Sequence, residues 1–110
     1  MRVHLLTNNT VEKYIASNIQ SRAPLESWLV SLKDADWDTP HDIKTTFNSA
    51  DMLGKGSKRV VFNIGGNKYR MICQYYFGKR KVSLFINWIG KHSEYSALCN
   101  FGKQFTIDDY

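Results

Sequence analysis

The chain has 110 residues, enough for one domain with a single hydrophobic core and too few for a second. Its composition, 43% hydrophobic residues against 23% charged ones, is that of a folded protein and excludes global disorder. Fifteen Lys and Arg against ten Asp and Glu give a net charge of +5, which favours an anionic partner such as nucleic acid, an anionic membrane or an acidic protein. We therefore expect residues 1–110 to form one basic domain.

Membrane, export and metal signals are absent from the sequence. No apolar run approaches the roughly 20 residues that cross a bilayer, and no signal-peptide pattern is present, so we expect a cytoplasmic protein without a membrane partner. Cys73 and Cys99 lie far apart without metal-ligand spacing, which favours neither a disulfide nor a zinc site. We interpret both as small buried hydrophobic side chains and expect no metal or other cofactor.

The first third of the chain predicts a short strand followed by two helices. Residues 2–7 have a β-like apolar centre, and Asn9 followed by Glu12 indicates a capping box at the start of a helix. This helix is expected to run to the residue before Pro24, with an apolar face of Val11, Tyr14, Ile15 and Ile19. Pro24 suits the first turn of a second helix, whose apolar face is Leu25, Trp28, Leu29 and Leu32.

The remainder of the chain predicts one short helix, a loop and an antiparallel meander. Thr39-Pro40 favours the start of a helix that carries Ile43 and Phe47, and residues 48–58 are polar, basic and without a period, as in an exposed loop. The period then changes to two, which predicts strands over 59–64, 68–77 and 81–89. A short helix carrying Tyr95 and Leu98 is expected to follow, with His92 at the rim of the sheet.

Turn lengths predict which side chains share a face of the sheet. A two-residue turn at Gly65-Gly66 would pair Phe62 with Tyr69. A four-residue turn over residues 78–81 would pair Met71 with Trp88. One face is then apolar and suited to lie under the helices, with Val60, Phe62, Tyr69, Met71, Cys73, Tyr75, Val82, Leu84, Ile86 and Trp88. The other is mainly polar and cationic, with Arg59, Asn63, Lys68, Arg70, Gln74, Ser83 and Asn87 beside the apolar Val61, Ile72, Phe85 and Ile89.

The expected fold class is therefore α+β, with amino-terminal helices packed on a twisted, mainly antiparallel sheet of about four strands and a short carboxy-terminal helix. Cleaving RNA without a metal requires a base, an acid and cations that hold the phosphate. Groups of these kinds occur on the cationic face and in the segment after it, at Arg59, Lys68, Arg70, Lys91, His92 and Tyr95. Residue types alone leave simpler interpretations open: a solvated or docking face, a capping role for His92 and a packing role for Tyr95.

Two blocks of sequence resemble a known family. The run RVVFNIGGNKYR over residues 59–70, followed about twenty residues later by IGKHSEY over 89–95, resembles the HigB-type toxins, a branch of the RelE superfamily, and the similarity covers nearly the whole chain. The resemblance implies a RelE-like fold and a ribosome-dependent endoribonuclease that cuts messenger RNA in the ribosomal A site. It also implies inhibition by a HigA-type antitoxin.

The same resemblance implies roles for particular residues. His92 is expected to act as general acid or base, Arg70 as the main phosphate clamp, and Tyr95 as a positioning or proton-relay group. Contacts with messenger or ribosomal RNA are expected from Arg59, Lys68, Lys91 and Lys58.

Three positions depart from the pattern of the family. Asn87 stands where relatives often have Arg, Lys91 where they have Thr, and Ser96 where they have Asp. We hypothesise that Lys91 restores the positive charge missing at Asn87. The departures also leave two alternatives open: a ribosome- or RNA-binding module that no longer cleaves, and a protein whose basic face docks an acidic chain such as an antitoxin.

Overall fold

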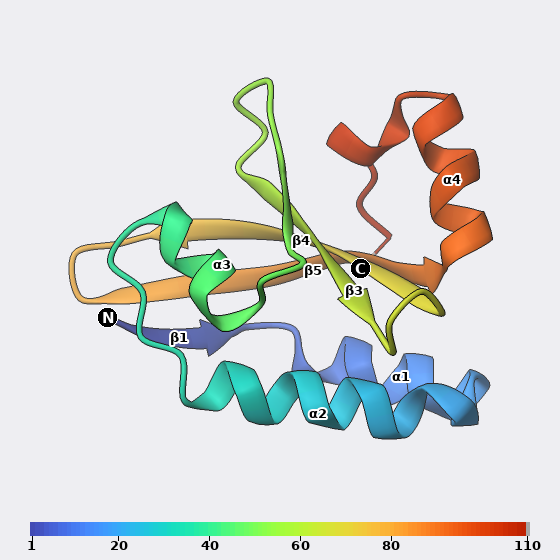
Figure 1. Ribbon diagram of the computed structural model, residues 1–110, viewed down its shortest axis with the longest axis horizontal. Coiled ribbons are helices and arrows are strands. Elements are labelled where there is room, and N and C mark those ends of the chain that lie inside the picture. Colours follow the sequence, from blue (N-terminus) through green and yellow to red (C-terminus); the bar gives the residue numbers. More distant parts are fainter. Residues whose placement is uncertain (110) are drawn as a thin grey trace.

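A five-stranded sheet divides residues 1–109, the part of the chain that the computed structural model describes, into two layers (Figure 1). Its strands are β1 (Arg2–Leu5), β2 (Asp51–Leu53), β3 (Arg59–Ile64), β4 (Tyr69–Phe77) and β5 (Lys81–Lys91). Their spatial order is β1-β5-β4-β3-β2, and every neighbouring pair is antiparallel except β1 and β5. The expected α+β class and mainly antiparallel sheet are confirmed.

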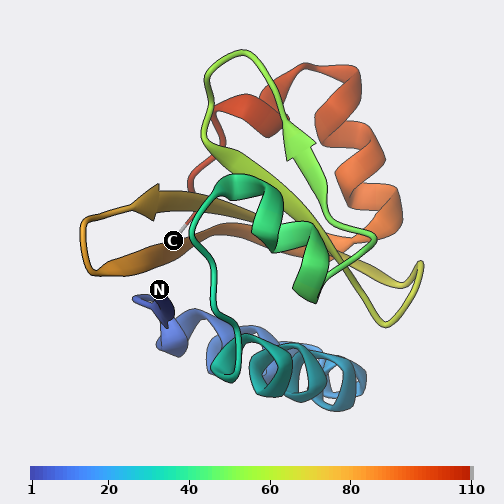
Figure 2. The same cartoon turned by 60° about the vertical axis from the view of Figure 1, so that its left-hand side comes forward.

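Helices lie on both sides of this sheet. The α-helices are α1 (Asn8–Ser17), α2 (Arg22–Lys33), α3 (Ile43–Thr46) and α4 (His92–Asn100), with short 3-10 turns at Ile19–Ser21, Pro40–Asp42 and Lys103–Phe105. Figure 2 shows α1 and α2 on one side of the sheet and α4 on the other. None of the helices in residues 1–109 is long and apolar enough to cross a membrane.

The main core lies between α1, α2, α3 and the first face of the sheet. The first face carries Val60, Phe62, Ile64, Tyr69, Met71, Cys73, Val82, Leu84, Ile86 and Ile89. Three aromatic rings join the layers, since the Phe62 centroid lies 5.3 Å from that of Trp28 and 5.0 Å from that of Phe47. Trp37 is fully buried, and its Nε1 donates a hydrogen bond to Thr46 Oγ1 at 2.9 Å. Such packing fixes both amphipathic helices and the short α3 on one side of the sheet.

The start of α1 differs from the sequence prediction. The helix begins at Asn8, so the capping box predicted at Asn9 and Glu12 is wrong. Thr7 is the N-cap residue, but its hydroxyl accepts a hydrogen bond from the Ile86 N–H at 2.9 Å and thereby ties the helix entry to β5. The chain leaves the α-helix after Ser17, so Ile19, predicted on the apolar face, is 66% exposed.

Two other departures concern the sheet. The predicted loop over 48–58 contains β2, which pairs with β3, so the sheet has five strands instead of about four. The turn between β3 and β4 spans four residues, so Phe62 pairs with Met71, two residues beyond the predicted partner Tyr69. A shift of two residues keeps each side chain on its predicted face.

A β-bulge in β5 changes the faces of the next two residues. Cys73 pairs with Ile86 and Ile72 pairs with Trp88, so Asn87 is an additional residue on β5. Beyond it, Ile89 packs in the main core, whereas Trp88 packs with Val61 and Ile72 on the second face. The prediction that placed Trp88 under the amino-terminal helices and Ile89 opposite them is therefore wrong.

The Trp88 indole lies directly over Gly90, and a Cβ built at this glycine would overlap the six-membered part of the indole ring. Gly90→Ala should therefore force the ring to move and lower the free energy of unfolding by about 1–3 kcal/mol. Denaturant unfolding followed by tryptophan fluorescence measures this change. Gly54→Ala is the matched control, because a Cβ there meets no atom within 4 Å, and equal losses from both variants would contradict the assigned packing.

Candidate functional site

The predicted site residues lie on and around the second face of the sheet. This face carries Arg59, Val61, Asn63, Arg70, Ile72, Gln74, Tyr76, Ser83, Phe85, Asn87 and Trp88. Val61, Ile72 and Trp88 form a small second core, on which Tyr95 and Leu98 of α4 and Ile107 pack. Residues 101–109, here named the carboxy-terminal segment, follow α4 across this face (Figure 1).

Arg70 is buried at one end of the second face. Its Nη1 donates to the backbone oxygens of Tyr69 at 3.0 Å and Gly66 at 3.2 Å, and its Nη2 donates to Asn67 Oδ1 at 3.2 Å. The side chain is only 7% exposed, so these bonds replace much of its hydration. All three acceptors are neutral, and the guanidinium is therefore a fixed positive charge held by the β3–β4 turn.

The start of α4 is attached to the same turn. The His92 N–H donates to the Lys68 backbone oxygen at 3.1 Å, and Glu94 Oε1 accepts a hydrogen bond from the Lys91 N–H at 2.7 Å. Glu94 thus caps the helix, and the imidazole of His92 remains exposed beside two exposed lysines. We name Lys68, Arg70, Lys91, His92 and Tyr95 the basic corner, because β4, β5 and α4 meet there.

Tyr95 lines this corner from the first turn of α4. Its ring is half-buried against Trp88, with the two centroids 6.2 Å apart. Burial, followed by a hydrogen bond with Cys99 and the charges of Cys99 and Asp51, raises the pKa of Tyr95, and the positive charge of Arg70 opposes this shift. The phenol therefore stays protonated at physiological pH, which suits a hydrogen-bond or proton donor and not a base.

The two cysteines have different surroundings. Cys73 is buried in the main core as predicted, and burial raises the pKa of its thiol. Cys99 is only half-buried on α4, next to Tyr95, and both thiols are free. Within residues 1–109 no group of three or more His, Cys, Asp or Glu side chains is arranged to hold a metal ion.

Arg59 lies apart from the basic corner, at the opposite end of β3 from Asn63, the residue that pairs with Arg70. Its Nη1 donates to the backbone oxygens of Ile107 at 2.6 Å and Gln104 at 3.3 Å. Desolvation lowers the pKa of Arg59, and the charge of Asp108 opposes this shift. The guanidinium thus fastens the carboxy-terminal segment to the sheet.

The structure therefore divides the predicted site residues into two groups. Lys68, Arg70, Lys91, His92 and Tyr95 come together at the basic corner, whereas Arg59 and the exposed Lys58 lie at the other end of β3. Sequence reasoning missed the position of Trp88 behind Tyr95, because strand alternation carries no signal for a bulge.

Asn87, predicted on the polar face and standing where relatives often have Arg, has two contacts with the carboxy-terminal segment. In the structure its Nδ2 donates to Asp108 Oδ1 at 3.3 Å, and its backbone oxygen accepts from the Asp109 N–H at 2.9 Å. Asn87 therefore anchors the end of the carboxy-terminal segment to the bulge.

Comparison with known proteins agrees with this architecture. Residues 21–98 match the HigB toxin family, which is described as the RelE-like toxic component of a toxin–antitoxin system. Helices on one face of a mixed sheet, with a carboxy-terminal helix over the other, define the chain as a RelE-like toxin. Because the match covers most of the chain, the protein belongs to the HigB toxin family.

Curated relatives extend nearly over the full length. The chain is 24% identical over 102 residues to the mRNA interferase HigB of Escherichia coli O6:H1, covering 93% of this chain and 97% of the relative. It is 26% identical over 93 residues to the mRNA interferase toxin HigB of Escherichia coli K12, and equally to the mRNA interferase HigB of Shigella flexneri. These alignments cover 84% of this chain and 88% of each relative.

The contacts of Arg59 predict a structural effect of its removal. Arg59→Ala should lower the free energy of unfolding by about 1–3 kcal/mol, because it deletes charged hydrogen bonds to two backbone oxygens. Amide hydrogen exchange should quicken in residues 101–109. Lys68→Ala, which removes an exposed cation, is the control for loss of charge, and unchanged exchange in Arg59→Ala would exclude the fastening role.

The raised pKa of Tyr95 predicts a pH dependence of stability. An unfolded tyrosine ionises near pH 10, so burial of the neutral phenol stabilises the fold below about pH 10 and this contribution is lost as the pH rises further. Wild type should lose more stability than Tyr95→Phe between pH 8 and pH 11, measured by denaturant unfolding. Tyr76→Phe, at a tyrosine 61% exposed, is the control, and parallel curves for wild type and Tyr95→Phe would refute the prediction.

Proposed function

We propose that this toxin is a ribosome-dependent endoribonuclease, which cleaves translated messenger RNA by acid–base chemistry without a metal. The observation that carries the proposal is the basic corner, where the fixed Arg70 guanidinium interacts with the neutral Tyr95 phenol and α4 begins at the exposed His92. Relatives named mRNA interferase support it, as does membership of the HigB family.

The proposed chemistry uses the 2′-hydroxyl of the RNA as nucleophile. A base removes its proton as the oxygen attacks the neighbouring phosphorus, and an acid protonates the departing 5′-oxygen. His92 and Tyr95 lie three residues apart on α4, a spacing that places side chains on the same side of a helix. Because the phenol is protonated at neutral pH, we assign Tyr95 to the donor role and His92 to the base.

Cations at the corner would hold the scissile phosphate as negative charge develops. Arg70 has N–H groups beyond the three bonds that fix it to the β3–β4 turn, so it can bind phosphate without losing its orientation. Lys68 and Lys91 are exposed on either side and would contact the RNA backbone. In this scheme Lys91 supplies the positive charge of the Arg that relatives often have at position 87.

Contacts at the other end of β3 would extend this interface. Lys58 is exposed there and is free to approach a phosphate. An RNA contact from Arg59 would use N–H groups other than those of Nη1, which is bonded to the carboxy-terminal segment.

The proposed partners of this toxin are an antitoxin and the ribosome. An antitoxin follows from the toxin–antitoxin family, and we propose that it is of the HigA type. The proposed target, messenger RNA in the ribosomal A site, places the activity in the cytoplasm. The net charge of +5 favours both ribosomal RNA and an acidic inhibitor.

Removal of the imidazole tests the function. Induced wild-type protein should arrest growth and create new 5′ ends in translated messages, as mapped by primer extension. His92→Ala should lose both effects, because a general acid or base contributes roughly 10²- to 10⁴-fold in rate. His41→Ala is the matched control, since His41 is also exposed but lies next to α3, on the main-core side of the sheet.

The same experiment separates the alternatives. Growth arrest without new 5′ ends would support an RNA- or ribosome-binding module that does not cleave. A well-expressed wild-type protein that produces neither arrest nor new ends would refute the proposed activity.

A further inference from the structure

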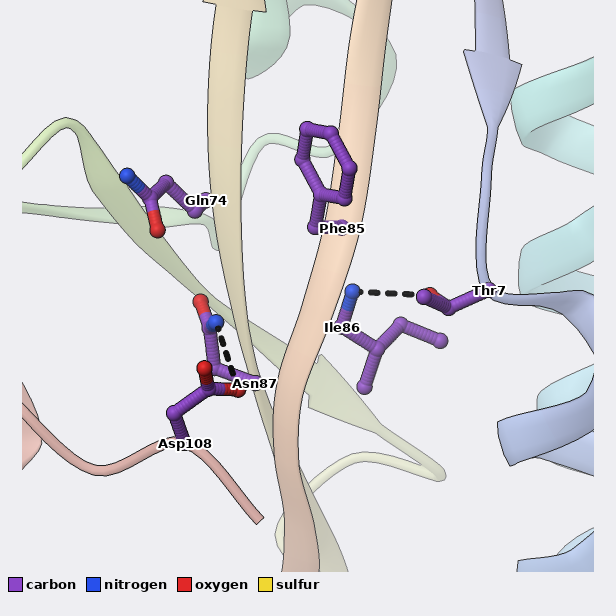
Figure 3. A pocket seen from close by; sticks show the side chains of 6 residues that line it. All are labelled: Thr7, Gln74, Phe85, Ile86, Asn87 and Asp108. Atoms are coloured by element: carbon purple, nitrogen blue, oxygen red, sulfur yellow. Dashed lines mark hydrogen bonds between the residues drawn. The ribbon is translucent and has the colours of Figure 1, made fainter. Parts of the chain in front are cut away.

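A pocket of about 330 Å³ lies along β5, between the carboxy-terminal segment and β4 on the second face and Thr7 beyond the end of β1 (Figure 3). Its lining residues are Thr7, Gln74, Phe85, Ile86, Asn87 and Asp108. Along β4, Gln74 lies four residues from Arg70, about 13 Å, and Asn87 lies opposite Ile72 and Cys73, two to three residues or about 7–10 Å from Arg70. The pocket is thus distinct from the proposed catalytic group but within reach of the same RNA strand.

Asn87 gives this pocket an unused hydrogen-bond acceptor. The residue is only 4% exposed, and its Oδ1 has no hydrogen-bond partner, whereas its Nδ2 is bonded to Asp108. Figure 3 shows this oxygen facing the same space as the amide of Gln74. A buried acceptor without a partner costs free energy, so the site favours a ligand that brings an N–H donor.

Phe85 and Asp108, which also line the pocket, favour a flat ligand with polar groups at its edge. Phe85 pairs directly with Gln74 across the sheet and is 38% exposed, so its ring offers an apolar surface beside the amide. The exposed carboxylate of Asp108 provides a second acceptor next to Asn87. A ligand that fits these walls has a flat aromatic ring, which stacks on Phe85, and an amino group at its edge, which donates to the acceptors. An aromatic heterocycle with an amino group has both features.

Charge at the neighbouring turn favours a ligand that also carries phosphate. Residues 79–81 at the tip of the β4–β5 hairpin are Lys, Arg and Lys, and all three are exposed. Tyr76, 61% exposed on the same face, extends the aromatic surface toward this tip. Exposed aromatic rings flanked by cations are the features with which proteins hold single-stranded nucleic acid.

We propose that this pocket binds one unpaired nucleobase with an exocyclic amino group, namely adenine, cytosine or guanine and not uracil, from a single RNA strand that continues to the basic corner. The base stacks on Phe85 and donates its amino hydrogens to Asn87 Oδ1 and the Asp108 carboxylate. The proposal rests on the proposed function, because it treats the strand as part of the RNA target.

Binding to short single-stranded RNA tests the pocket. The probes are fluorescein-labelled homopolymers of C, A and U, with every 2′-hydroxyl methylated to prevent cleavage, and affinity is read by fluorescence anisotropy. The wild-type protein should bind C and A more tightly than U. Phe85→Ala should weaken C binding roughly fivefold to a hundredfold, which is the effect of losing one base–aromatic stack.

Three further variants make the test specific. Phe101→Ala is the matched control, because Phe101 is 77% exposed and lies outside the pocket, and it should keep wild-type affinity. Gln74→Ala, at an exposed position that should not disturb folding, should reduce the preference for C over U. Asn87→Leu should abolish this preference, with circular dichroism confirming that the variant is folded.

Three other outcomes decide between the nucleobase site, a protein docking site and the loss of cleavage alone. Equal affinity for C and U, with no effect of Phe85→Ala, overturns the nucleobase site, even if messenger RNA cleavage by the wild type is intact. If Phe85→Ala spares RNA binding and weakens co-purification with the antitoxin, the pocket is a protein docking site and the proposal fails. Base preference in a protein that produces no cleavage supports the pocket and refutes only the proposed activity.

Discussion

The additional residue in β5 is the constraint on which the second face depends. In a regular strand the Trp88 ring would enter the main core and Ile89 would face outward, leaving Val61 and Ile72 to hold α4. The bulge at Asn87 exchanges these two side chains, and Trp88 then supplies the surface on which Tyr95 packs. A bulge leaves backbone groups outside the ladder, and here the Asn87 backbone oxygen accepts a hydrogen bond from the Asp109 N–H. The Ile86 N–H, which faces the other edge of β5 beyond the end of β1, donates to the Thr7 hydroxyl.

Two buried arginines serve this face in different ways. Each guanidinium is stabilised by backbone oxygens, so its hydration is replaced without an opposing carboxylate in direct contact. Arg70 is bonded to the turn that also receives the start of α4, so its charge is held close to His92 and Tyr95. Arg59 is bonded to the carboxy-terminal segment and holds that segment on the second face.

The second face thus has two polar regions separated by packed side chains. The basic corner combines fixed charge with an exposed imidazole and a phenol, whereas the pocket beside Phe85 combines an aromatic ring with hydrogen-bond acceptors. Catalysis needs charge stabilisation, and base recognition needs stacking and edge contacts, so the two regions would act on different parts of one strand. The carboxy-terminal segment contributes to the second region through Asp108.

Periodicity and turn residues are local properties of the chain, and they predicted the α+β class, the faces of β3 and the order of the strands and helices apart from β2. His92, Tyr95 and Arg70 were proposed as site residues from their residue types and from the resemblance of their sequence blocks to the HigB-type toxins. Three features became visible in the folded chain alone: Trp88 and Ile89 exchange faces, residues 51–53 add a fifth strand, and Arg59 holds the carboxy-terminal segment. These features depend on contacts between residues distant in sequence, such as Arg59 with Ile107 and Asn87 with Asp108, for which local patterns carry no signal.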